Sequence, residues 1–314
     1  MKLARPNVFH PRIVLAGCPQ LPSGDGDDAG LVQALRRRGL QARWLSWDHP
    51  DVVRADIVVL RATWDYAQRL DEFLAWTTTV PHLLNAPSVV AWNADKRYLL
   101  DLARHGVPTV PSTVFAPGEV VRLPGAEEVV VKPATGAGAV GAQRFTSSDA
   151  ALAHAAALQA RGAAVVVQPY DQRVERAGET ALVFLGGKPS HAFAKAAILP
   201  PQGRQTELDA TATYAIETLT PAEPDFEIWD VGFAALAAAA EQLNTSARDF
   251  LYARVDVIGN IDDPRLLELE LIEPSLGWMQ LGEKTRELTQ REFARCLASS
   301  LERLGLGPLS HRRP

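Results

Sequence analysis

Short apolar runs alternate with amphipathic segments along the first third of the chain. Three runs have the length and composition of buried strands: residues 12–17 (RIVLAG), 42–47 and 55–60. Three segments carry apolar residues at helical spacing: residues 29–38, 71–79 and 95–105. The first helix ends at Gly39 and the last at Gly106, and glycine commonly terminates helices. This alternation predicts an α/β lobe around a parallel sheet.

The rest of the chain contains more strands. Seven segments predict strands: residues 128–132, 142–146, 164–168, 180–185, 190–194, 251–258 and 265–272. Three segments predict helices: residues 148–161 (with Ser148 or Asp149 as N-cap), 230–243 and 289–304. Strands that meet across Gly186–Gly187 and Gly259–Asn260 predict antiparallel hairpins. The segment 199–213 has little periodicity and predicts a loop, and the tail 311–314 is expected to fray.

Composition indicates a folded globular protein. The 314 residues are 47% hydrophobic and 22% charged, which suffices for a sizeable core. The net charge of −5 argues against a nucleic-acid backbone as the main partner. No apolar stretch is long enough to span a bilayer, and the first ten residues lack the apolar core of a signal peptide. Cys18 and Cys296 lie far apart, and no histidines cluster, so a zinc site or a hydrolytic triad is not predicted. A cytoplasmic protein is expected.

A glycine-rich segment follows Lys132 in the sequence VVVKPATGAGAVG. Gly136, Gly138 and Gly141 match the spacing G-x-G-x-x-G, which by itself indicates a dinucleotide-binding fold. In that fold the glycines end a strand and open a helix, whereas here further residues intervene and a strand follows. The segment instead predicts a loop between antiparallel strands, with backbone N–H groups that cover phosphate oxygens beside Lys132. A solvated hairpin tip is the alternative.

Acidic residues crowd one strand near the end of the chain. Glu268 and Glu270 are two residues apart, so both side chains point to one face. The opposite strand, 251–258, places Asp256 where it would join them. Such crowded carboxylates need a cation or hydrogen bonds, and oxygen ligands suit Mg²⁺, with Mn²⁺ as a substitute. Glu273 is a further candidate ligand, the choice among the three glutamates stays open, and an exposed acidic face is the alternative.

These features together resemble the ATP-grasp superfamily of carboxylate–amine ligases over nearly the whole chain. The resemblance rests on WNADKRYLLDLARHGVPTVPST, the Lys132 strand with its glycine loop, VVVQPY, and Arg254-Val255-Asp256 followed by LLELELIEPS. Within the superfamily, RATWDY, WNADKRYL, GETALVF and ELELIEPS are most similar to the branch that contains the O-ureido-serine cyclo-ligase of cycloserine biosynthesis. The superfamily usually has Glu-x-Asn where this chain has Glu268 and Glu270, which leaves the second metal ligand undecided.

The resemblance implies a role for each matching residue. It implies nucleotide binding by Lys96, Lys132, Gly136, Gly138, Gly141, Gln168, Pro169, Tyr170 and Glu179. It implies metal binding by Asp256 with members of the set Glu268, Glu270 and Glu273. Arg254 and Lys195 are the implied catalytic residues, because their charges would neutralise the transferring phosphoryl group or an acyl phosphate.

The third strand leads into the sequence RATWDY. Ligands of open α/β sheets gather at the carboxyl ends of strands, so Arg61, Trp64, Asp65 and Tyr66 would hold an amino-acid-like molecule there. Equally, the rings would pack a lobe interface while Arg61 pairs with Asp65. Ser275, in EPSLG, is a further candidate substrate contact.

The resulting prediction is an α/β protein of the ATP-grasp fold, with an N-terminal parallel lobe and two α+β lobes that enclose the nucleotide. Its lobes would span residues 1–92 (substrate), 93–168 (glycine-rich loop) and 169–314 (metal site). We expect an ADP-producing ligase that phosphorylates a carboxylate or carbonyl-type oxygen of a small amino-acid-like substrate, which a nitrogen then attacks. The alternatives are a nicotinamide-dependent oxidoreductase and a non-catalytic nucleotide-binding module. The sequence is compatible with a homodimer but does not fix the oligomeric state.

Overall fold

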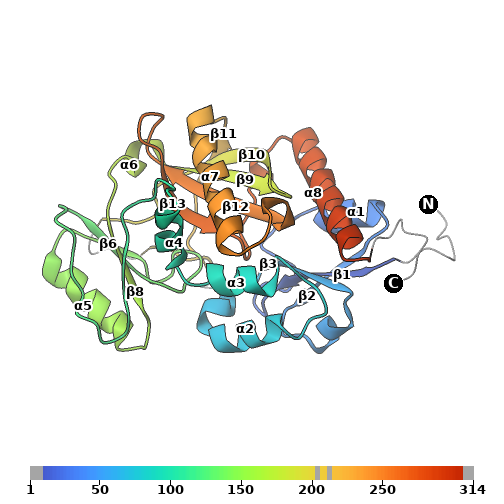
Figure 1. Ribbon diagram of the computed structural model, residues 1–314, viewed down its shortest axis with the longest axis horizontal. Coiled ribbons are helices and arrows are strands. Elements are labelled where there is room, and N and C mark those ends of the chain that lie inside the picture. Colours follow the sequence, from blue (N-terminus) through green and yellow to red (C-terminus); the bar gives the residue numbers. More distant parts are fainter. Residues whose placement is uncertain (1–9, 202–205, 211–213, 307–314) are drawn as a thin grey trace.

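The computed structural model describes residues 10–201, 206–210 and 214–306 (Figure 1). Within these ranges, the strands form three sheets. The tail 311–314 and parts of the predicted loop 199–213 lie outside the described residues.

The N-terminal lobe is built on a parallel sheet, as predicted, in the order β2-β1-β3-β4. Its elements are β1 (Arg12–Gly17), α1 (Leu31–Arg37), β2 (Gln41–Ser46), η1 (Pro50–Arg54), β3 (Ile57–Ala62), η2 (Trp64–Gln68), α2 (Leu70–Thr77), β4 (Leu83–Leu84) and α3 (Pro87–Asn93). Successive residues of its strands point to opposite faces. Leu15 and Val59 pack with α1 on one face, and Val14 and Val58 pack with α2 and α3 on the other.

The central lobe contains an antiparallel sheet in the order β5-β8-β6-β7. Its elements are α4 (Tyr98–Arg104), β5 (Thr113–Phe115), β6 (Val129–Pro133), β7 (Gln143–Phe145), α5 (Ser148–Gln159) and β8 (Val165–Pro169). Alanines on one side of α5 pack against the sheet. The N-cap of α5 is Ser147, whose Oγ accepts a hydrogen bond from the N–H of Ala150, so the prediction of Ser148 or Asp149 was wrong by one or two residues.

The C-terminal lobe contains an antiparallel sheet in the order β11-β10-β9-β12-β13. Its elements are α6 (Val174–Ala177), β9 (Glu179–Leu185), β10 (Lys188–Lys195), β11 (Leu219–Ala222), α7 (Phe226–Gln242), η3 (Ala247–Asp249), β12 (Tyr252–Ile258), β13 (Arg265–Glu270), η4 (Trp278–Gln280) and α8 (Glu283–Arg303). Both predicted hairpins are confirmed. Val255 and Leu269 pack toward α7, so their neighbours Arg254, Asp256, Glu268 and Glu270 share the opposite face.

Two helices begin earlier than the pattern predicted. α8 starts at Glu283. The pattern missed its first six residues (EKTREL) because Leu288 is the only apolar side chain among them and is exposed. α7 starts at Phe226, whose ring also faces solvent. Hydrophobic periodicity reports burial, so helical turns that stand clear of the core give no signal.

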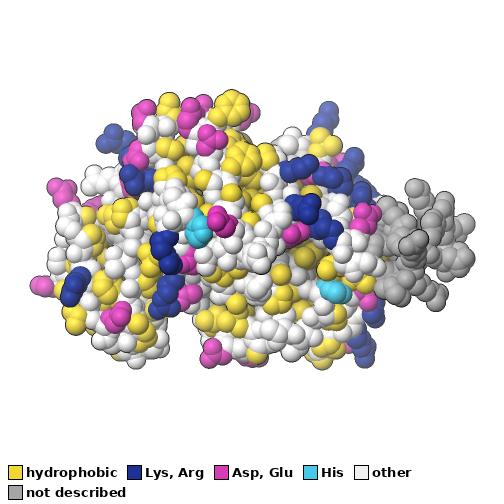
Figure 2. Space-filling view, viewed as in Figure 1, with side chains coloured by type: hydrophobic (Ala, Val, Ile, Leu, Met, Phe, Trp, Pro, Cys, Tyr) yellow, Lys and Arg dark blue, Asp and Glu magenta, His cyan; other side chains and the backbone are white. Residues whose placement is uncertain are grey.

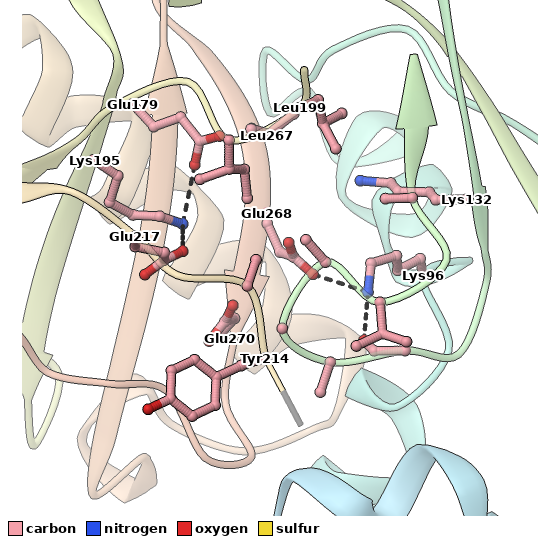
Figure 3. Close-up of a pocket in the computed structure, with 18 of the residues that line it drawn as sticks. Lys96, Lys132, Glu179, Lys195, Leu199, Tyr214, Glu217, Leu267, Glu268 and Glu270 are labelled. Atoms are coloured by element: carbon pink, nitrogen blue, oxygen red, sulfur yellow. Dashed lines mark hydrogen bonds and ion pairs between the residues drawn. The ribbon is translucent and has the colours of Figure 1, made fainter. Parts of the chain in front are cut away.

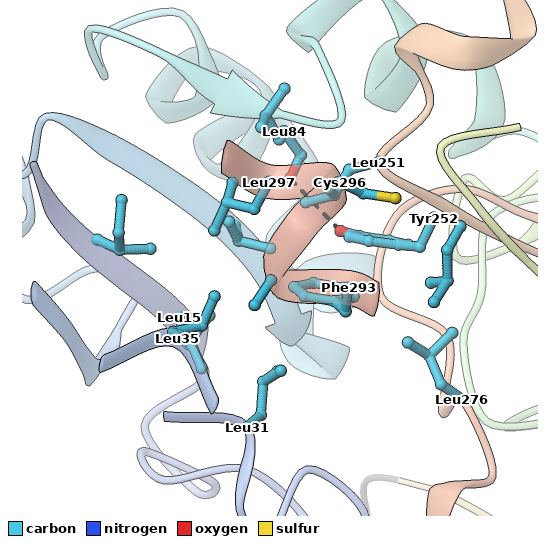
Figure 4. Packing of buried hydrophobic residues seen from close by; sticks show 14 of the residues in the cluster. Leu15, Leu31, Leu35, Leu84, Leu251, Tyr252, Leu276, Phe293, Cys296 and Leu297 are labelled. Atoms are coloured by element: carbon cyan, nitrogen blue, oxygen red, sulfur yellow. Dashed lines mark hydrogen bonds between the residues drawn. The ribbon is translucent and has the colours of Figure 1, made fainter. Parts of the chain in front are cut away.

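The N-terminal and C-terminal lobes share one hydrophobic core. Leu15 and Leu35 of the first lobe pack in the same cluster as Tyr252, Phe293 and Leu297 of the last (Figure 4). The buried Asn85 adds a polar connection: its Nδ2 donates to the carbonyls of Tyr252 and Leu271, and its Oδ1 accepts from the N–H of Leu251. These contacts fix the end of β4 against β12 and against the residue that follows β13.

The surface carries both charges interspersed (Figure 2). Apolar side chains gather at the top of this view, over α7, where Phe226 and Phe233 are exposed. Within the described ranges, no helix is long and apolar enough to cross a membrane.

Candidate active site

A cavity of about 280 Å³ lies where the three lobes meet. Its walls come from the loop between β6 and β7, from residues 168–170 at the end of β8 (called the hinge below), and from the face of β12 and β13 opposite α7. Residues after β3 and β13 close one end. Most of the site residues predicted from the sequence line this cavity. The exceptions are Arg61, Asp65, Gly141 and Asp256.

Two lysines and a glutamate meet on one side of this cavity (Figure 3). The Lys96 ammonium lies 2.9 Å from a Glu268 carboxylate oxygen and donates to the carbonyl of Gly136 at 2.9 Å. Although burial alone would raise it, the ammonium groups of Lys96 and Lys132 lower the pKa of Glu268 to about 2. The side-chain ammonium of Lys132 has no hydrogen bond or ion pair with any described residue, and burial lowers the pKa of Lys132. An anion placed beside Lys132 would relieve that cost.

Lys195 is surrounded by carboxylates rather than left free. Its ammonium contacts Asp256 at 2.9 Å, Glu179 at 3.0 Å and Glu217 at 3.4 Å. Burial opposes the charged form, but the carboxylates outweigh it and raise the pKa of Lys195 well above its usual value. The lysine lines the cavity and remains charged at any physiological pH.

Arg254 connects the strand face to the loop after β13. Its guanidinium contacts both oxygens of Asp256 at 2.9 Å and one oxygen of Glu270 at 2.6 Å, and it donates to the carbonyl of Ser275 at 3.1 Å. Asp256 is only 1% exposed. Burial raises the pKa of Glu270 to about 7 against the effect of Arg254, and the nearby Glu268 adds to the increase.

The glycine-rich loop joins two antiparallel strands, β6 and β7. Gly138 and Gly141 have φ of 58° and 79°, a region that side chains other than glycine rarely adopt. His154 bonds the carbonyl of Gly141, so this glycine anchors the loop instead of lining the cavity. The strand–loop–strand arrangement excludes the strand–loop–helix geometry of a dinucleotide fingerprint.

The residues at the end of β3 separate into two groups. Arg61 is 2% exposed and pairs with Asp28 at 3.1 Å, and its Nη2 donates to the carbonyl of Pro274. Asp65 accepts from the indole of Trp47 and from Arg69, so the alternative pairing of Arg61 with Asp65 was wrong. The side chains of Arg61 and Asp65 are therefore buried in the protein and do not point into the cavity.

Trp64 and Tyr66, in contrast, line the cavity. The indole of Trp64 donates to the carbonyl of Glu273 at 3.1 Å. Ser275 also lines the cavity, and its hydroxyl donates to Asp27. The aromatic half of the predicted substrate set thus lies at the cavity, and the charged half does not.

Comparison with known proteins gives the family. Residues 13–85 match the family model of the D-cycloserine synthetase DcsG N-terminal domain. The cycloserine biosynthesis protein DcsG of Streptomyces lavendulae is 38% identical over 273 residues, covering 81% of this chain and 88% of the relative. The chain belongs to the DcsG family.

Solved structures of the DcsG family and its ATP-grasp neighbours agree with this assignment. The crystal structure of D-cycloserine synthetase DcsG matches with a TM-score of 0.81 and 34% identity, covering 92% of this chain and 99% of that chain. D-alanine–D-alanine ligase from Bacillus anthracis, solved with ATP, matches with a TM-score of 0.63 at 14% identity, covering 94% and 98%. The fold is ATP-grasp, and the protein is an ATP-dependent ligase, as the sequence predicted.

The hinge strand of this DcsG-family ligase presents Gln168, Pro169 and Tyr170 to the cavity. Gln168 is 2% exposed and its amide donates to the hydroxyl of Ser112. The guanidinium of Arg144 stacks over the Tyr170 ring, 3.8 Å from its centroid. This contact fixes the ring at the cavity wall.

The carboxylates were expected to form a metal site. Within the described ranges, no three His, Cys, Asp or Glu side chains come together closely enough to hold a metal ion by themselves. Glu268 and Glu270 nevertheless both line the cavity, and carboxylate oxygens are the ligands that Mg²⁺ prefers. Two carboxylates fit a Mg²⁺ whose other ligands are water and phosphate oxygens.

Glu273 differs from the other two glutamates. Its Oε2 is buried and has no hydrogen-bond partner among the described residues. Burial first, and then repulsion from Glu270, raises the pKa of Glu273 well above its usual value. A raised pKa favours the protonated carboxyl, which donates a hydrogen bond more readily than it binds a metal.

Sequence reasoning missed several residues that line the cavity: Asp25, Asn93, Tyr98, Tyr214 and Glu217. Tyr214 and Glu217 follow a segment without periodicity, and Asp25 lies in a glycine- and aspartate-rich loop. The acidic character of that loop was a signal, because it follows the carboxyl end of β1.

Proposed function

We propose that this ligase phosphorylates the carboxylate of a small amino-acid-like substrate with ATP and then lets a nitrogen displace the phosphate. The decisive observation is that the buried Lys132 ammonium, beside Lys96 and Glu268 in one cavity, has no partner among the described residues. A buried ammonium without a partner is costly unless an anion joins it, and a nucleotide phosphate supplies that anion.

The cavity divides into three parts in this proposal. The adenine end lies at Gln168, Pro169 and Tyr170, with Glu179 toward the ribose. The phosphates lie under the glycine-rich loop, against Lys96 and Lys132. Lys195 and Arg254 line the same cavity, and in this proposal their charges would balance the negative charge of the transferring group.

Glu268 and Glu270 are the proposed magnesium ligands. Bound Mg²⁺ neutralises charge on phosphate oxygens. Asp256 would join only if Arg254 or Lys195 releases it, because both of its oxygens are already occupied.

The substrate is proposed to lie at the far end of the cavity, among Trp64, Tyr66, Glu273 and Ser275. The carboxylate of the substrate would pair with Arg254, and its amine would pair with Asp25. The γ-phosphoryl group passes to a carboxylate oxygen, the nitrogen forms a bond to the carbonyl carbon, and phosphate leaves with that oxygen. The sequence resembles the branch of the O-ureido-serine cyclo-ligase, and the name of the S. lavendulae relative concerns cycloserine biosynthesis, so O-ureidoserine is the first substrate to test.

The test is ADP and phosphate release with Mg-ATP and a panel of both enantiomers of O-ureidoserine, serine and alanine. We expect release above the substrate-free rate with O-ureidoserine. Formation of AMP and pyrophosphate, or no nucleotide turnover with any member, contradicts the proposal.

A further inference from the structure

Two aromatic rings from distant parts of the chain meet at the far end of the cavity. Trp64 follows β3, and Tyr214 precedes β11. Their ring centroids are 4.7 Å apart, with an interplanar angle of 60°. Both residues line the cavity.

Each ring is held by hydrogen bonds of its own segment. The Trp64 indole donates to the carbonyl of Glu273 at 3.1 Å, which ties it to the C-terminal lobe. The N–H of Tyr214 donates to Asp209, and the next residue, Ala215, donates its N–H to the carbonyl of Gly138 in the glycine-rich loop. The ring pair is therefore connected to all three lobes.

The position of the two rings in the cavity determines which part of a bound substrate would contact them. In Figure 3, Tyr214 lies at the end of the cavity opposite Leu199 and Leu267, beyond Glu270. In the proposed function the reacting carboxylate lies near Arg254, and we expect the rest of the substrate to extend toward the two rings that line the same cavity. Rings in edge contact leave no passage between them, whereas one more peptide residue adds about 3.5 Å of chain.

We propose that Trp64 and Tyr214 form an aromatic partition that restricts the ligase to a free amino-acid-like molecule and excludes the same residue at the end of a peptide. This inference rests on the proposed function and narrows its substrate class. The partition acts on the size of the substrate, not on the nucleotide, because its rings stand at the end remote from the adenine hinge.

The experiment compares two probes that share the reacting end: O-ureidoserine and glycyl-O-ureidoserine, which keeps the carboxylate and the ureido group. ADP release gives kcat/KM for both probes with the wild type, Tyr214→Ala and Tyr214→Phe. We expect the ratio of dipeptide to free amino acid to rise by about 10- to 100-fold in Tyr214→Ala and to stay near the wild-type ratio in Tyr214→Phe. The KM for ATP should change by less than about 2-fold, since the nucleotide end is untouched.

Trp64→Phe provides a second variant should Tyr214→Ala fold poorly; its smaller ring should raise the same ratio by a lesser amount. A wild type that uses both probes equally well contradicts the partition while the proposed function stands. An unchanged ratio in folded Tyr214→Ala also contradicts it, because rejection of the dipeptide then has another cause. A wild type that turns over neither probe nor any member of the serine and alanine panel contradicts the proposed function itself.

Discussion

The end of β3 and the face shared by β12 and β13 both carry acids and bases, yet they use them differently. At the end of β3, Arg61 meets Asp28 inside the protein, and both are almost fully buried. On the β13 face, Glu268 and Glu270 bind Lys96 and Arg254 while still lining the cavity. The first set holds the loop after β13 in place through the carbonyl of Pro274, and the second remains open to a ligand.

The difference teaches that charge alone does not identify a functional residue. Arg61 looked like a substrate contact because it ends a strand, but its guanidinium is used by Asp28 and a backbone carbonyl. Lys132 has no such partner among the described residues, and that unmet need marks it as a ligand contact. Four substitutions test this division.

The largest effect is expected from Arg61→Met. It leaves the Asp28 carboxylate buried without its partner, which costs roughly 3–5 kcal/mol of unfolding free energy. Denaturant unfolding measures the loss. Arg12→Met breaks the exposed pair with Asp56 and should cost less than about 1 kcal/mol. Unchanged stability together with a raised KM for the amino-acid substrate would move Arg61 into the substrate site.

Glu268→Gln should lower kcat for ADP release by about 10²- to 10³-fold. The substitution keeps the shape of the side chain but removes the negative charge that faces Lys96 and the proposed metal. Steady-state ADP assays with Glu227→Gln, an exposed glutamate of α7, serve as the control. A variant with near wild-type activity would show that Glu268, like the buried pair Arg61 and Asp28, has a structural and not a catalytic role.

Lys132→Met should weaken ATP binding by about 10- to 100-fold, the loss of one charge-assisted contact. The nucleotide-free protein should be no less stable than the wild type, because the substitution removes a buried ammonium that lacks a described partner. Titration calorimetry measures the loss of ATP affinity, and thermal unfolding measures the stability of the nucleotide-free protein. Lys188→Met, at an exposed lysine, is the control for both measurements. A clear loss of stability without nucleotide would show that Lys132 has a structural role.

The smallest effect concerns pH and His191. Its Nε2 donates to the carbonyl of Leu276 at 2.6 Å, and burial lowers the pKa of the imidazole. A histidine with a lowered folded pKa stabilises the fold fully above its unfolded pKa of about 6.5, and this stability is lost as pH falls. Between pH 7.5 and 5, His191→Asn should lose less unfolding free energy than the wild type. Equal pH slopes for His191→Asn and the wild type would contradict the assignment to His191.

Local sequence patterns were enough to predict the regular parts of the site. Glu268 and Glu270 lie on one face because a strand has a period of two, and Asp256 pairs with Glu268 in the antiparallel strands β12 and β13. The parallel sheet of the first lobe followed from the alternation of strands and helices, whereas the three-lobe architecture came from the resemblance to the ATP-grasp superfamily. The predictions from local patterns required only neighbours along the chain.

Contacts between distant segments could not be predicted in the same way. Asp28 lies 33 residues before Arg61 and is in a loop whose course no periodicity defines. Tyr214 reaches Trp64 only because the segment before β11 is bonded to the glycine-rich loop. Such partners depend on tertiary packing, which a single sequence does not encode in its spacing.

The shared core also has a consequence for how the chain is made. β1 and β3 leave the ribosome early, but Phe293 and Leu297 of α8, which pack in the same cluster, come more than two hundred residues later. At about 5–20 residues per second, the apolar face of the first sheet waits on the order of 10–40 s for its cover. The apolar face of the first sheet is therefore a site of potential aggregation until α8 has been synthesised, the kind of exposure that chaperones cover.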